Sequence, residues 1–452
     1  MQTDKIVVGL DIGTTKVCAV VGKLDEHGKV EILGIGTAVS TGVDEGNVTN
    51  LDRTTDSIVE AIKQAEQYSG CNIGEVNVGV AGQHVRNIVQ SGTYVRPASE
   101  GTISVADVDS FNSNMYRTVV NAGRQVIHVI PQEYVVDSKT RVSDPVGVAG
   151  TSMEADFQLI VADITSVRNI QTSVNRANLS IAYPEGLMLQ PIASALAVLS
   201  DDEKEMGVVL VDIGGGTTDM AIYYKGILRY AAVIPLGGNI ITSDIQQGCM
   251  ILKPQAEKLK INHGHAIPAE VQDNDIITVE SIAGRPSKEV AKKTLAQFIE
   301  ARASEIVGLF HQELILSGYE DLVNAGIVIT GGGANLRNIV EMFEYTTGKP
   351  TRVGIPDVYV SHKSVSQANS PSLATAIGLV RAGFYSHDYR VNSYRERYGY
   401  AKAENNNNGK AITSGSTQQK ATKSPGLFDK LGTMFKKVIL DDSVGGTEDY
   451  DK

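Results

Sequence analysis

Two glycine-rich loops, each led by an aspartate, carry the residue types that bind a phosphorylated ligand. The first is Asp11-Ile-Gly-Thr-Thr-Lys16 and the second, about two hundred residues later, is Asp212-Ile-Gly-Gly-Gly-Thr-Thr-Asp219. Glycines let backbone N–H groups approach phosphate oxygens, and hydroxyls such as those of Thr14, Thr217 and Thr218 add donors. One carboxylate per loop suits a hydrated Mg²⁺ ion. The repetition predicts a nucleotide held between two similar halves.

The flanking residues predict how these loops are positioned. Apolar, β-branched runs over 6–10 and 208–211 precede them, so each is expected as a hairpin turn after a strand. A third loop, Thr330-Gly-Gly-Gly-Ala334, follows the apolar run 325–329 and precedes a predicted helix over 335–347, a position suited to a base or sugar. One such loop is more often an ordinary turn, but three in this order favour a nucleotide site.

The order of the loops resembles the actin, Hsp70 and sugar-kinase superfamily, whose phosphate 1, phosphate 2 and adenosine motifs they match. Segments 190–199 and 370–379 look like its two connecting helices, because their small residues would let two helices cross closely. Ala256-Glu257-x-x-Lys260 resembles its adenosine-contacting helix. Within the superfamily the chain resembles the FtsA family over about residues 5–383 and again near its end, most specifically at 211–219, 233–244 and 283–286.

The resemblance implies an α/β fold: a two-lobed, actin-like (ribonuclease H-like) ATPase with an inserted small α+β subdomain, called 1C or SHS2. The expected parts are subdomain 1A at 1–83, 164–206 and 362–388, subdomain 1C at 84–163, subdomain 2A at 207–235 and 299–361, and subdomain 2B at 236–298. The chain pattern itself shows only that a self-contained segment interrupts the first half.

Hydrophobic periodicity predicts the local elements. In the first half we expect strands over 6–10, 16–23, 30–39 and 75–80 with a helix over 52–69, then in the insertion strands over 126–130, 132–136 and 157–162 with a helix over 105–123. After it follow a helix over 167–178 and a strand over 183–187, and the second half holds a long amphipathic helix over 288–317.

The resemblance also implies ATP and Mg²⁺ as ligands and assigns residues to them. Asp11 and Asp212 would hold the metal ion. The nucleotide-binding residues would be Gly13, Thr14, Thr15, Lys16, Gly214, Gly215, Gly216, Thr217, Glu257, Lys260, Gly331, Gly332 and Gly333. In related ATPases the polar residue that opens the first connecting helix positions the attacking water; Gln190 has that place here, with Asp219 nearby. Because a neutral glutamine is a poor base, we expect slow turnover and mainly a switching role for the nucleotide.

The last part of the chain predicts a membrane anchor on a tether. Residues 389–425 are polar and expected as a disordered linker. Residues 426–440 form an amphipathic stretch with three lysines and one aspartate on its polar face, typical of an interfacial helix, although a helix docked on the protein's own core is the alternative. Its expected membrane-binding residues are Leu427, Phe428, Leu431, Met434, Phe435, Lys436, Lys437, Val438 and Ile439. The acidic tail 441–452 would be repelled by anionic lipid.

The family resemblance implies several partners. They are the C-terminal tail of FtsZ, further copies of this chain in a filament, late division proteins bound through 84–163, and the cytoplasmic face of the membrane at the division septum. The FtsZ tail would meet a charged group on subdomain 2B and the following helix, consisting of Arg285, Lys288, Lys292, Lys293, Glu300 and Arg302. For any single one of these charges a solvated helix face is the simpler interpretation.

Composition excludes some classes of protein. The 452 residues, 42% hydrophobic and 21% charged, leave room for about two to four compact units. A net charge of −11 argues against general nucleic-acid binding, which needs a basic face. Three cysteines without Cys-x-x-Cys spacing fit a reducing compartment, and no apolar signal core or run of about eighteen apolar residues occurs. We therefore expect a peripheral membrane protein with a cytoplasmic body.

Three other functions share this fold. A sugar or acid kinase would need a hydroxyl-substrate pocket and a catalytic aspartate, for which Asp219 is the candidate, but no sugar-binding set is evident. An Hsp70-type chaperone would need a peptide-binding domain after about residue 390, where the linker leaves no room. A pilus-assembly adaptor resembling PilM stays open as the nearest alternative, although it would lack the amphipathic helix.

Overall fold

The computed structural model describes residues 5–96, 101–182, 186–280, 286–365 and 368–384. All of them belong to the first of two compact units, residues 1–401, and the predicted linker, amphipathic helix and acidic tail lie outside the described residues. In the described part of the chain, no helix combines the length and apolarity that crossing a membrane requires.

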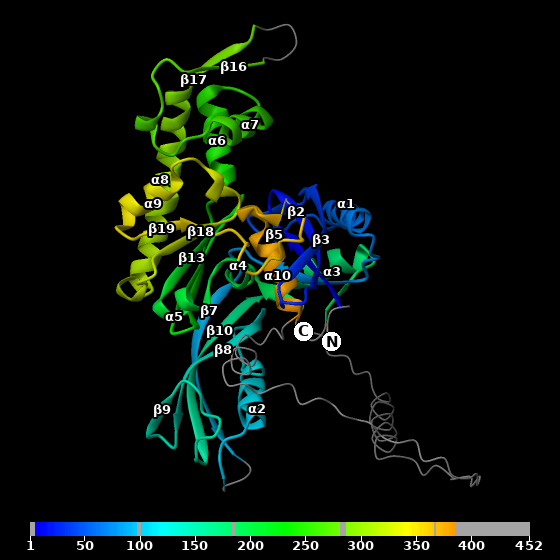
Figure 1. The fold of residues 1–452 in the computed structure, drawn as a ribbon, viewed down its shortest axis with the longest axis vertical. Helices are drawn as coiled ribbons and strands as arrows, with labels where there is room; N and C mark the ends of the chain where they lie inside the picture. Colours follow the sequence, from blue (N-terminus) through cyan, green and yellow to red (C-terminus); the bar gives the residue numbers. More distant parts are fainter. Residues whose placement is uncertain (1–4, 97–100, 183–185, 281–285, 366–367, 385–452) are drawn as a thin grey trace, which may run out of the picture. The chain divides into compact units, whose positions relative to one another are not determined.

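A six-stranded sheet forms the core of the first lobe (Figure 1). Its order is β3-β2-β1-β6, and β11 and β12 both pair with β6 in parallel. The strands are β1 (Ile6–Ile12), β2 (Lys16–Leu24), β3 (Val30–Val39), β6 (Glu75–Val80), β11 (Ser180–Ile181) and β12 (Leu187–Leu189). Helix α1 (Leu51–Ser69) packs on β3 and β2, and α3 (Ile164–Arg176) packs on α1. A short hairpin of β4 (Val43–Asp44) and β5 (Asn47–Val48) precedes α1.

The second lobe repeats this topology in a five-stranded sheet of order β15-β14-β13-β18-β19. The strands are β13 (Val208–Ile213), β14 (Thr218–Tyr224), β15 (Ile227–Ile234), β18 (Ile327–Thr330) and β19 (Thr351–Val353). Each sheet begins with an antiparallel hairpin, β1–β2 in the first lobe and β13–β14 in the second, and a third strand, β3 or β15, pairs antiparallel with the second strand of that hairpin. The following strand of the same sheet, β6 or β18, pairs in parallel with the first strand. This duplicated topology confirms the predicted two-lobed actin-like fold.

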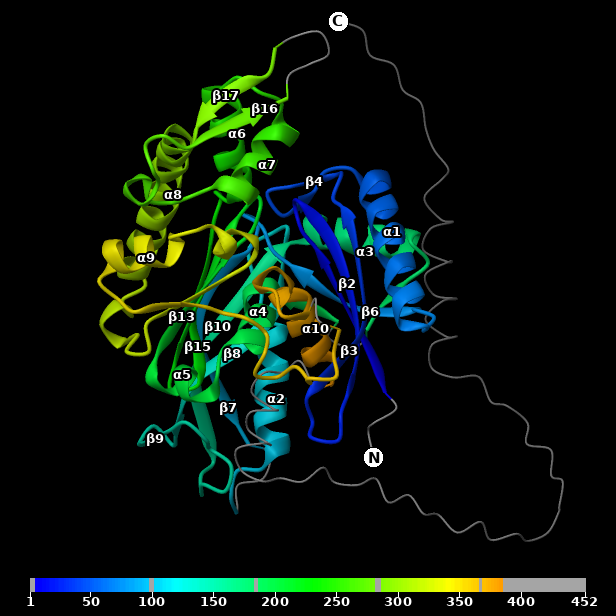
Figure 2. The same cartoon turned by 45° about the horizontal axis from the view of Figure 1, so that its top comes forward.

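The outer part of the second lobe holds α6 (Gly238–Cys249), α7 (Lys253–His263), β16 (Ile276–Val279) and β17 (Lys288–Ala291), above α8 (Lys292–Leu316) (Figure 2). The predicted helix over 288–317 therefore begins four residues too early, because 288–291 pair with β16 instead. The predicted helix over 335–347 is α9 (Ile339–Thr347), preceded by a 3-10 turn at Gly332–Asn335.

The insertion forms its own four-stranded sheet, β7-β10-β8-β9, with one helix. Its elements are β7 (Arg86–Val95), α2 (Val105–Tyr116), β8 (Arg124–Val136), β9 (Thr140–Val142) and β10 (Ser152–Asp163). The two strands predicted over 126–136 are one strand, since Pro131 lies beside a register shift where its missing N–H is tolerated. The predicted helix over 105–123 ends at Tyr116, before the β-branched run 118–120.

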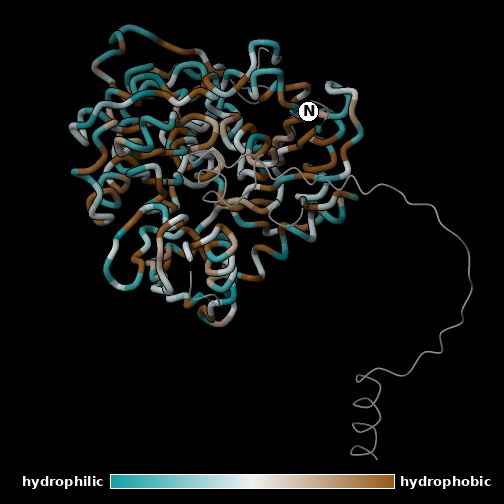
Figure 3. The backbone as a smooth tube through the Cα atoms, turned by 60° about the horizontal axis from the view of Figure 1, so that its bottom comes forward, coloured by the Kyte–Doolittle hydropathy of each residue, from teal (hydrophilic) through white to brown (hydrophobic). Residues whose placement is uncertain are grey.

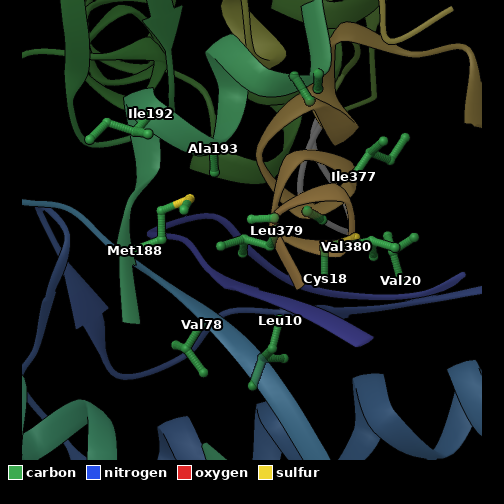
Figure 4. Close-up of a cluster of buried hydrophobic side chains, with 14 of the residues drawn as sticks. Leu10, Cys18, Val20, Val78, Met188, Ile192, Ala193, Ile377, Leu379 and Val380 are labelled. Carbon is green, nitrogen blue, oxygen red and sulfur yellow. The ribbon is translucent and has the colours of Figure 1, made fainter. Parts of the chain in front are cut away.

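Helices α4 (Gln190–Val198) and α10 (Ala374–Phe384) pack against each other, and Figure 4 shows side chains of both in one buried cluster, among them Ala193 of α4 and Leu379 of α10. A Cβ on Gly378 would lie 1.8 Å from the carbonyl oxygen of Ala193, so the helices touch backbone to backbone. Both predicted connecting helices are therefore present, the second opening with a 3-10 turn at Pro371–Leu373. The strand predicted over 183–187 is β12, shifted to Leu187–Leu189, with 183–185 outside the described residues. Helix α5 (Asp201–Met206) leads into β13.

In Figure 3 the hydrophobic stretches of the backbone lie mostly inside the molecule, and many hydrophilic stretches lie at its outer turns. The largest core cluster joins β1, β2, α1, α4 and α10, and further clusters fill the second lobe, its outer part and the insertion. Gln132 and Arg229 connect the insertion to the second lobe: Arg229 donates to Gln132 Oε1 at 3.1 Å, and Gln132 Nε2 donates to the Leu228 carbonyl at 3.1 Å.

Candidate functional site

Both glycine-rich loops are hairpin turns of the same form, as the sequence predicts. In the first, Gly13 N donates to Lys16 O at 3.0 Å between β1 and β2; in the second, Gly214 N donates to Thr217 O at 2.9 Å between β13 and β14. Asp11 and Asp212 occupy the same place in their strands, one residue before the strand ends. The two loops thus present equivalent carboxylates and amides from opposite lobes.

The two loops interlock across the cleft. A Cβ on Gly215 would lie 1.9 Å from Thr15 Oγ1, and one on Gly216 would lie 2.6 Å from Thr14 Oγ1. Thr15 also donates to Asn239 Oδ1 at 3.3 Å across the lobes. The missing side chains of the second loop therefore make room for the threonines of the first.

A cavity of about 460 Å³ opens between the loops. Its lining brings together all the residues that the sequence analysis assigned to metal, nucleotide or water, with the exception of Thr218: Asp11, Gly13, Thr14, Thr15, Lys16, Gln190, Asp212, Gly214, Gly215, Gly216, Thr217, Asp219, Glu257, Lys260, Gly331, Gly332 and Gly333. These residues come from both lobes and from a connecting helix. The cavity therefore brings together carboxylates, hydroxyls, lysines and glycine loops of the kinds that bind a nucleotide.

Three buried carboxylates, those of Asp11, Asp212 and Asp219, line the cavity beside the two Asp-led loops. Burial raises the pKa of Asp11 to about 7 and that of Asp219 to about 8, and also raises the pKa of Asp212. Lys16 opposes the rise at Asp11, whereas Asp212, directly opposite Asp219 in the β13–β14 ladder, adds to the rise at Asp219. Asp219 Oδ2 accepts from Thr217 Oγ1 at 3.1 Å, and its Oδ1 has no hydrogen-bond partner among the described residues. This excess of buried negative potential suits a cation.

No group of three or more His, Cys, Asp or Glu side chains within the described ranges forms a metal site by itself. Mg²⁺ does not require one, because it usually binds one or two carboxylates together with waters and substrate phosphates. Asp11 and Asp212, one from each lobe, fit that pattern.

The outer part of the second lobe contributes a charged pair and an apolar wall to the cavity lining. Lys260 Nζ lies 2.8 Å from Glu257 Oε2 and donates to Gly238 O at 2.9 Å, while Thr242 Oγ1 donates to Glu257. The apolar wall consists of Ile241, Ile261, Ala303, Ile306, Val307, Leu336 and Ile339. Gly331 has φ +82°, and a Cβ there would lie 2.3 Å from Asp212 Oδ1, so the third loop needs glycine to pass this carboxylate.

Sequence reasoning missed several residues at this site. Gly46 N donates to Thr14 Oγ1 at 3.1 Å, Lys16 Nζ donates to Ser372 O at 2.6 Å, and Ser194 and Thr375 both contact Asp212. Only Ser194 had a usable signal, because it lies four residues after Gln190 on the same helix face. Thr218 is absent from the cavity lining: its hydroxyl donates to Leu236 O at 2.8 Å.

Of the six charged residues expected to meet FtsZ, the five that the structure describes are absent from the cavity lining. Arg285 is outside the described residues, Lys288 is exposed on β17, and Glu300 is half-buried on α8. The others are paired within the lobe: Lys292 with Asp275 at 2.8 Å, Lys293 with Asp273, and Arg302 Nε with Asp244 Oδ2 at 2.7 Å. Their positions do not test the predicted role.

Comparison with known proteins agrees with this architecture. The model of the family "Cell division protein FtsA" matches residues 209–378, and that of the SHS2 domain inserted in FtsA matches residues 82–161. The chain is 37% identical over 383 residues to the cell division protein FtsA of Pseudomonas aeruginosa, covering 85% of this chain and 90% of the relative. It is 35% identical over 390 residues to the FtsA of Escherichia coli K12, covering 85% and 91%.

A chain from a solved PilM-PilN type IV pilus biogenesis complex shares the fold. The TM-score is 0.60 at 15% identity, and the match covers 83% of this chain and 98% of the other. At that identity the likeness shows the fold alone. The sequence relatives thus favour the division-protein interpretation over the pilus adaptor.

Proposed function

The chain belongs to the FtsA family of cell division proteins, and on that premise we propose that it is a nucleotide-switched, actin-like protein that anchors FtsZ filaments to the cytoplasmic membrane. The observation that carries this proposal is the pair of interlocking loops around one cavity. A ligand held by both loops contacts both lobes at once, so its presence can change the free energy of the closed arrangement relative to an open one.

The proposed ligand is ATP with Mg²⁺. The amides of Gly13 and Gly214–Gly216 and the hydroxyls of Thr14, Thr15 and Thr217 would bind the phosphates together with Lys16. Glu257, Lys260 and the glycines 331–333 would contact the adenosine. Asp11 and Asp212 would hold the cation, which when bound neutralises phosphate charge.

Hydrolysis is proposed to be slow. Gln190 Nε2 donates to Asp11 Oδ1 at 2.8 Å, so its amide serves first to orient a carboxylate. Asp219 is the remaining candidate base, and its raised pKa means that it is largely protonated near neutral pH in the ligand-free protein. The nucleotide therefore acts as a switch rather than as a rapidly consumed substrate.

The remaining parts of the proposal concern partners. The helix 426–440 would bind the membrane reversibly, and copies of the chain in a filament would add avidity. The charged group on subdomain 2B would receive the FtsZ tail, and the insertion would receive late division proteins. The protein would then work as a peripheral protein at the division septum.

Liposome co-sedimentation tests this function. The full chain and a version ending at Ser424 are each mixed with anionic liposomes and FtsZ, with ATP, with ADP and without nucleotide. We expect only the full chain to pellet and carry FtsZ with it, most strongly with ATP. Equal sedimentation of the two versions would contradict the anchor, and FtsZ that stays in the supernatant while the full chain pellets would contradict the adaptor role.

A further inference from the structure

We propose that Ser194 and Thr375 are positioning residues that hold the carboxylate of Asp212 in place for a nucleotide-bound divalent cation and tie it to the crossing of α4 and α10. The inference rests on the proposed function, because it assumes that a nucleotide and its cation bind in this cleft. It adds two residues that no phosphate motif contains.

Both hydroxyls converge on one oxygen atom. Ser194 Oγ donates to Asp212 Oδ2 at 2.6 Å, Thr375 Oγ1 donates to the same oxygen at 3.1 Å, and the two hydroxyls lie 3.0 Å apart. Ser194, Thr375 and Asp212 are 0%, 8% and 8% exposed, so solvent does not compete strongly for these bonds. Hydrogen bonds to an ionised carboxylate are roughly twice as strong as neutral ones, and two of them fix its rotation.

Helix α4 contacts both carboxylates that the nucleotide site presents. Gln190, its first residue, donates to Asp11 Oδ1 at 2.8 Å, and Ser194 donates to Asp212. Residues four apart lie on the same face of a helix. One face of α4 therefore sets the separation between a carboxylate of the first lobe and a carboxylate of the second.

The crossing of the two helices determines where the hydroxyls lie. Ala193, next to Ser194, touches Gly378, which is one turn after Thr375 in α10. Because this contact is between backbones, rotation of one helix against the other would separate the two hydroxyls or move Asp212. The opposite side of the carboxylate faces Gly331, which offers no side chain to replace them.

Groups that orient a metal-ligating carboxylate affect the affinity for the metal more than the fold. Their removal typically lowers metal affinity about 10- to 100-fold. A hydroxyl that only stabilised the fold would weaken nucleotide binding equally with and without the cation. The dependence of binding on Mg²⁺ therefore separates the two roles.

The test uses the full chain and the variants Ser194→Ala, Thr375→Val and Thr375→Ser. Thr54→Val is the matched control, since Thr54 is a fully buried threonine of α1 whose hydroxyl donates to Gly42 O and Asn50 O, away from the cavity. The dissociation constant of a fluorescent ATP analogue is measured in EDTA and across a Mg²⁺ series, with thermal melting as a check of folding.

We expect Ser194→Ala and Thr375→Val to bind the analogue in EDTA within about twofold of the parent, but to need about 10- to 100-fold more Mg²⁺ for the tightening that Mg²⁺ gives the parent. Thr375→Ser and Thr54→Val should behave as the parent does. Ser194→Ala and Thr375→Val lie on different helices, so if one variant misfolds, the other still tests the inference.

Two results would overturn the inference alone: an unchanged Mg²⁺ series in folded variants, or an equal loss of affinity with and without Mg²⁺. A parent chain that binds no nucleotide would overturn the proposed function as well. The outcomes are therefore distinguishable.

Discussion

The two lobes share the order of the four sheet strands around their Asp-led loops, yet the two loops contribute differently to the contact between them. The first loop supplies side chains, with two threonines and a lysine after a single glycine, and the second supplies space, with three glycines in a row. Each threonine of the first loop lies where a side chain of the second would otherwise be. The same strand order thus produces an asymmetric contact, in which the threonines of the first loop occupy the space that the glycines of the second loop leave open.

A second difference lies across the hairpins. Asp11 faces Cys18 in the ladder of the first lobe, whereas Asp212 faces Asp219 in the second. The second lobe therefore carries an additional buried acid next to its carboxylate. We expect the second lobe to dominate the electrostatics of the cleft and the first to dominate its steric fit.

The largest effect should come from filling the space in the second loop. In Gly215→Ala the new Cβ would clash with Thr15, so the loops cannot interlock and ATP affinity should fall about 10- to 100-fold, the usual effect of losing a hydrogen bond to a charged group. Calorimetric titration of Mg·ATP measures this. Adding Thr15→Ala removes the clashing hydroxyl and should restore part of the loss, whereas additive losses in the double variant would argue against interlocking.

The next comparison is between the glycines of two helices, Gly378 in the connecting helix α10 and Gly308 in α8 of the second lobe. Gly378→Ala in α10 would press a Cβ against Ala193 and should lower the free energy of unfolding by about 1–3 kcal/mol, the usual cost of overpacking. Denaturant unfolding of parent and variant measures the change. An unchanged midpoint would mean that the helices do not cross as closely as described.

The buried acids predict a pH dependence of stability. The folded pKa of Asp219, about 8, lies above its ordinary 3.8, so between these values the folded state keeps a proton that the unfolded state has lost. The free energy of unfolding of the ligand-free protein should therefore fall as pH rises from about 4 to about 8. Urea unfolding between pH 5 and pH 8 measures the slope. Asp219→Asn should make the slope smaller and leave the part that Asp11 and Asp212 contribute, and equal slopes in parent and variant would refute the assignment.

The smallest expected effect is an increase in the free energy of unfolding. Gly308 in α8 has no atom within 4 Å of the place where a Cβ would lie, so Gly308→Ala should raise the free energy of unfolding by up to about 1 kcal/mol through helix propensity. The same denaturant unfolding detects it and serves as the control for Gly378→Ala. A loss instead of a gain would show that α8 is packed on this face too.

Sequence alone predicted the features that local pattern fixes. The two Asp-led hairpins and the third glycine loop follow from apolar runs ending in glycine, and the family resemblance added both connecting helices. These elements come together at the cavity as expected. The features that the sequence did not predict depend on contacts between residues far apart in the chain. Residues 288–291 have a helical pattern but pair with β16, and Pro131 does not divide β8, because a register shift accommodates it. Thr375 reaches Asp212 from 163 residues away, which no spacing rule predicts.

Hydrogen exchange of the full chain with and without Mg·ATP tests the central claim most directly. A nucleotide clamped between the lobes should slow exchange in both phosphate loops, 11–16 and 212–219, and in the third loop, 331–333, over the same concentration range. Protection confined to one lobe, or no protection at saturating Mg·ATP, would contradict the account.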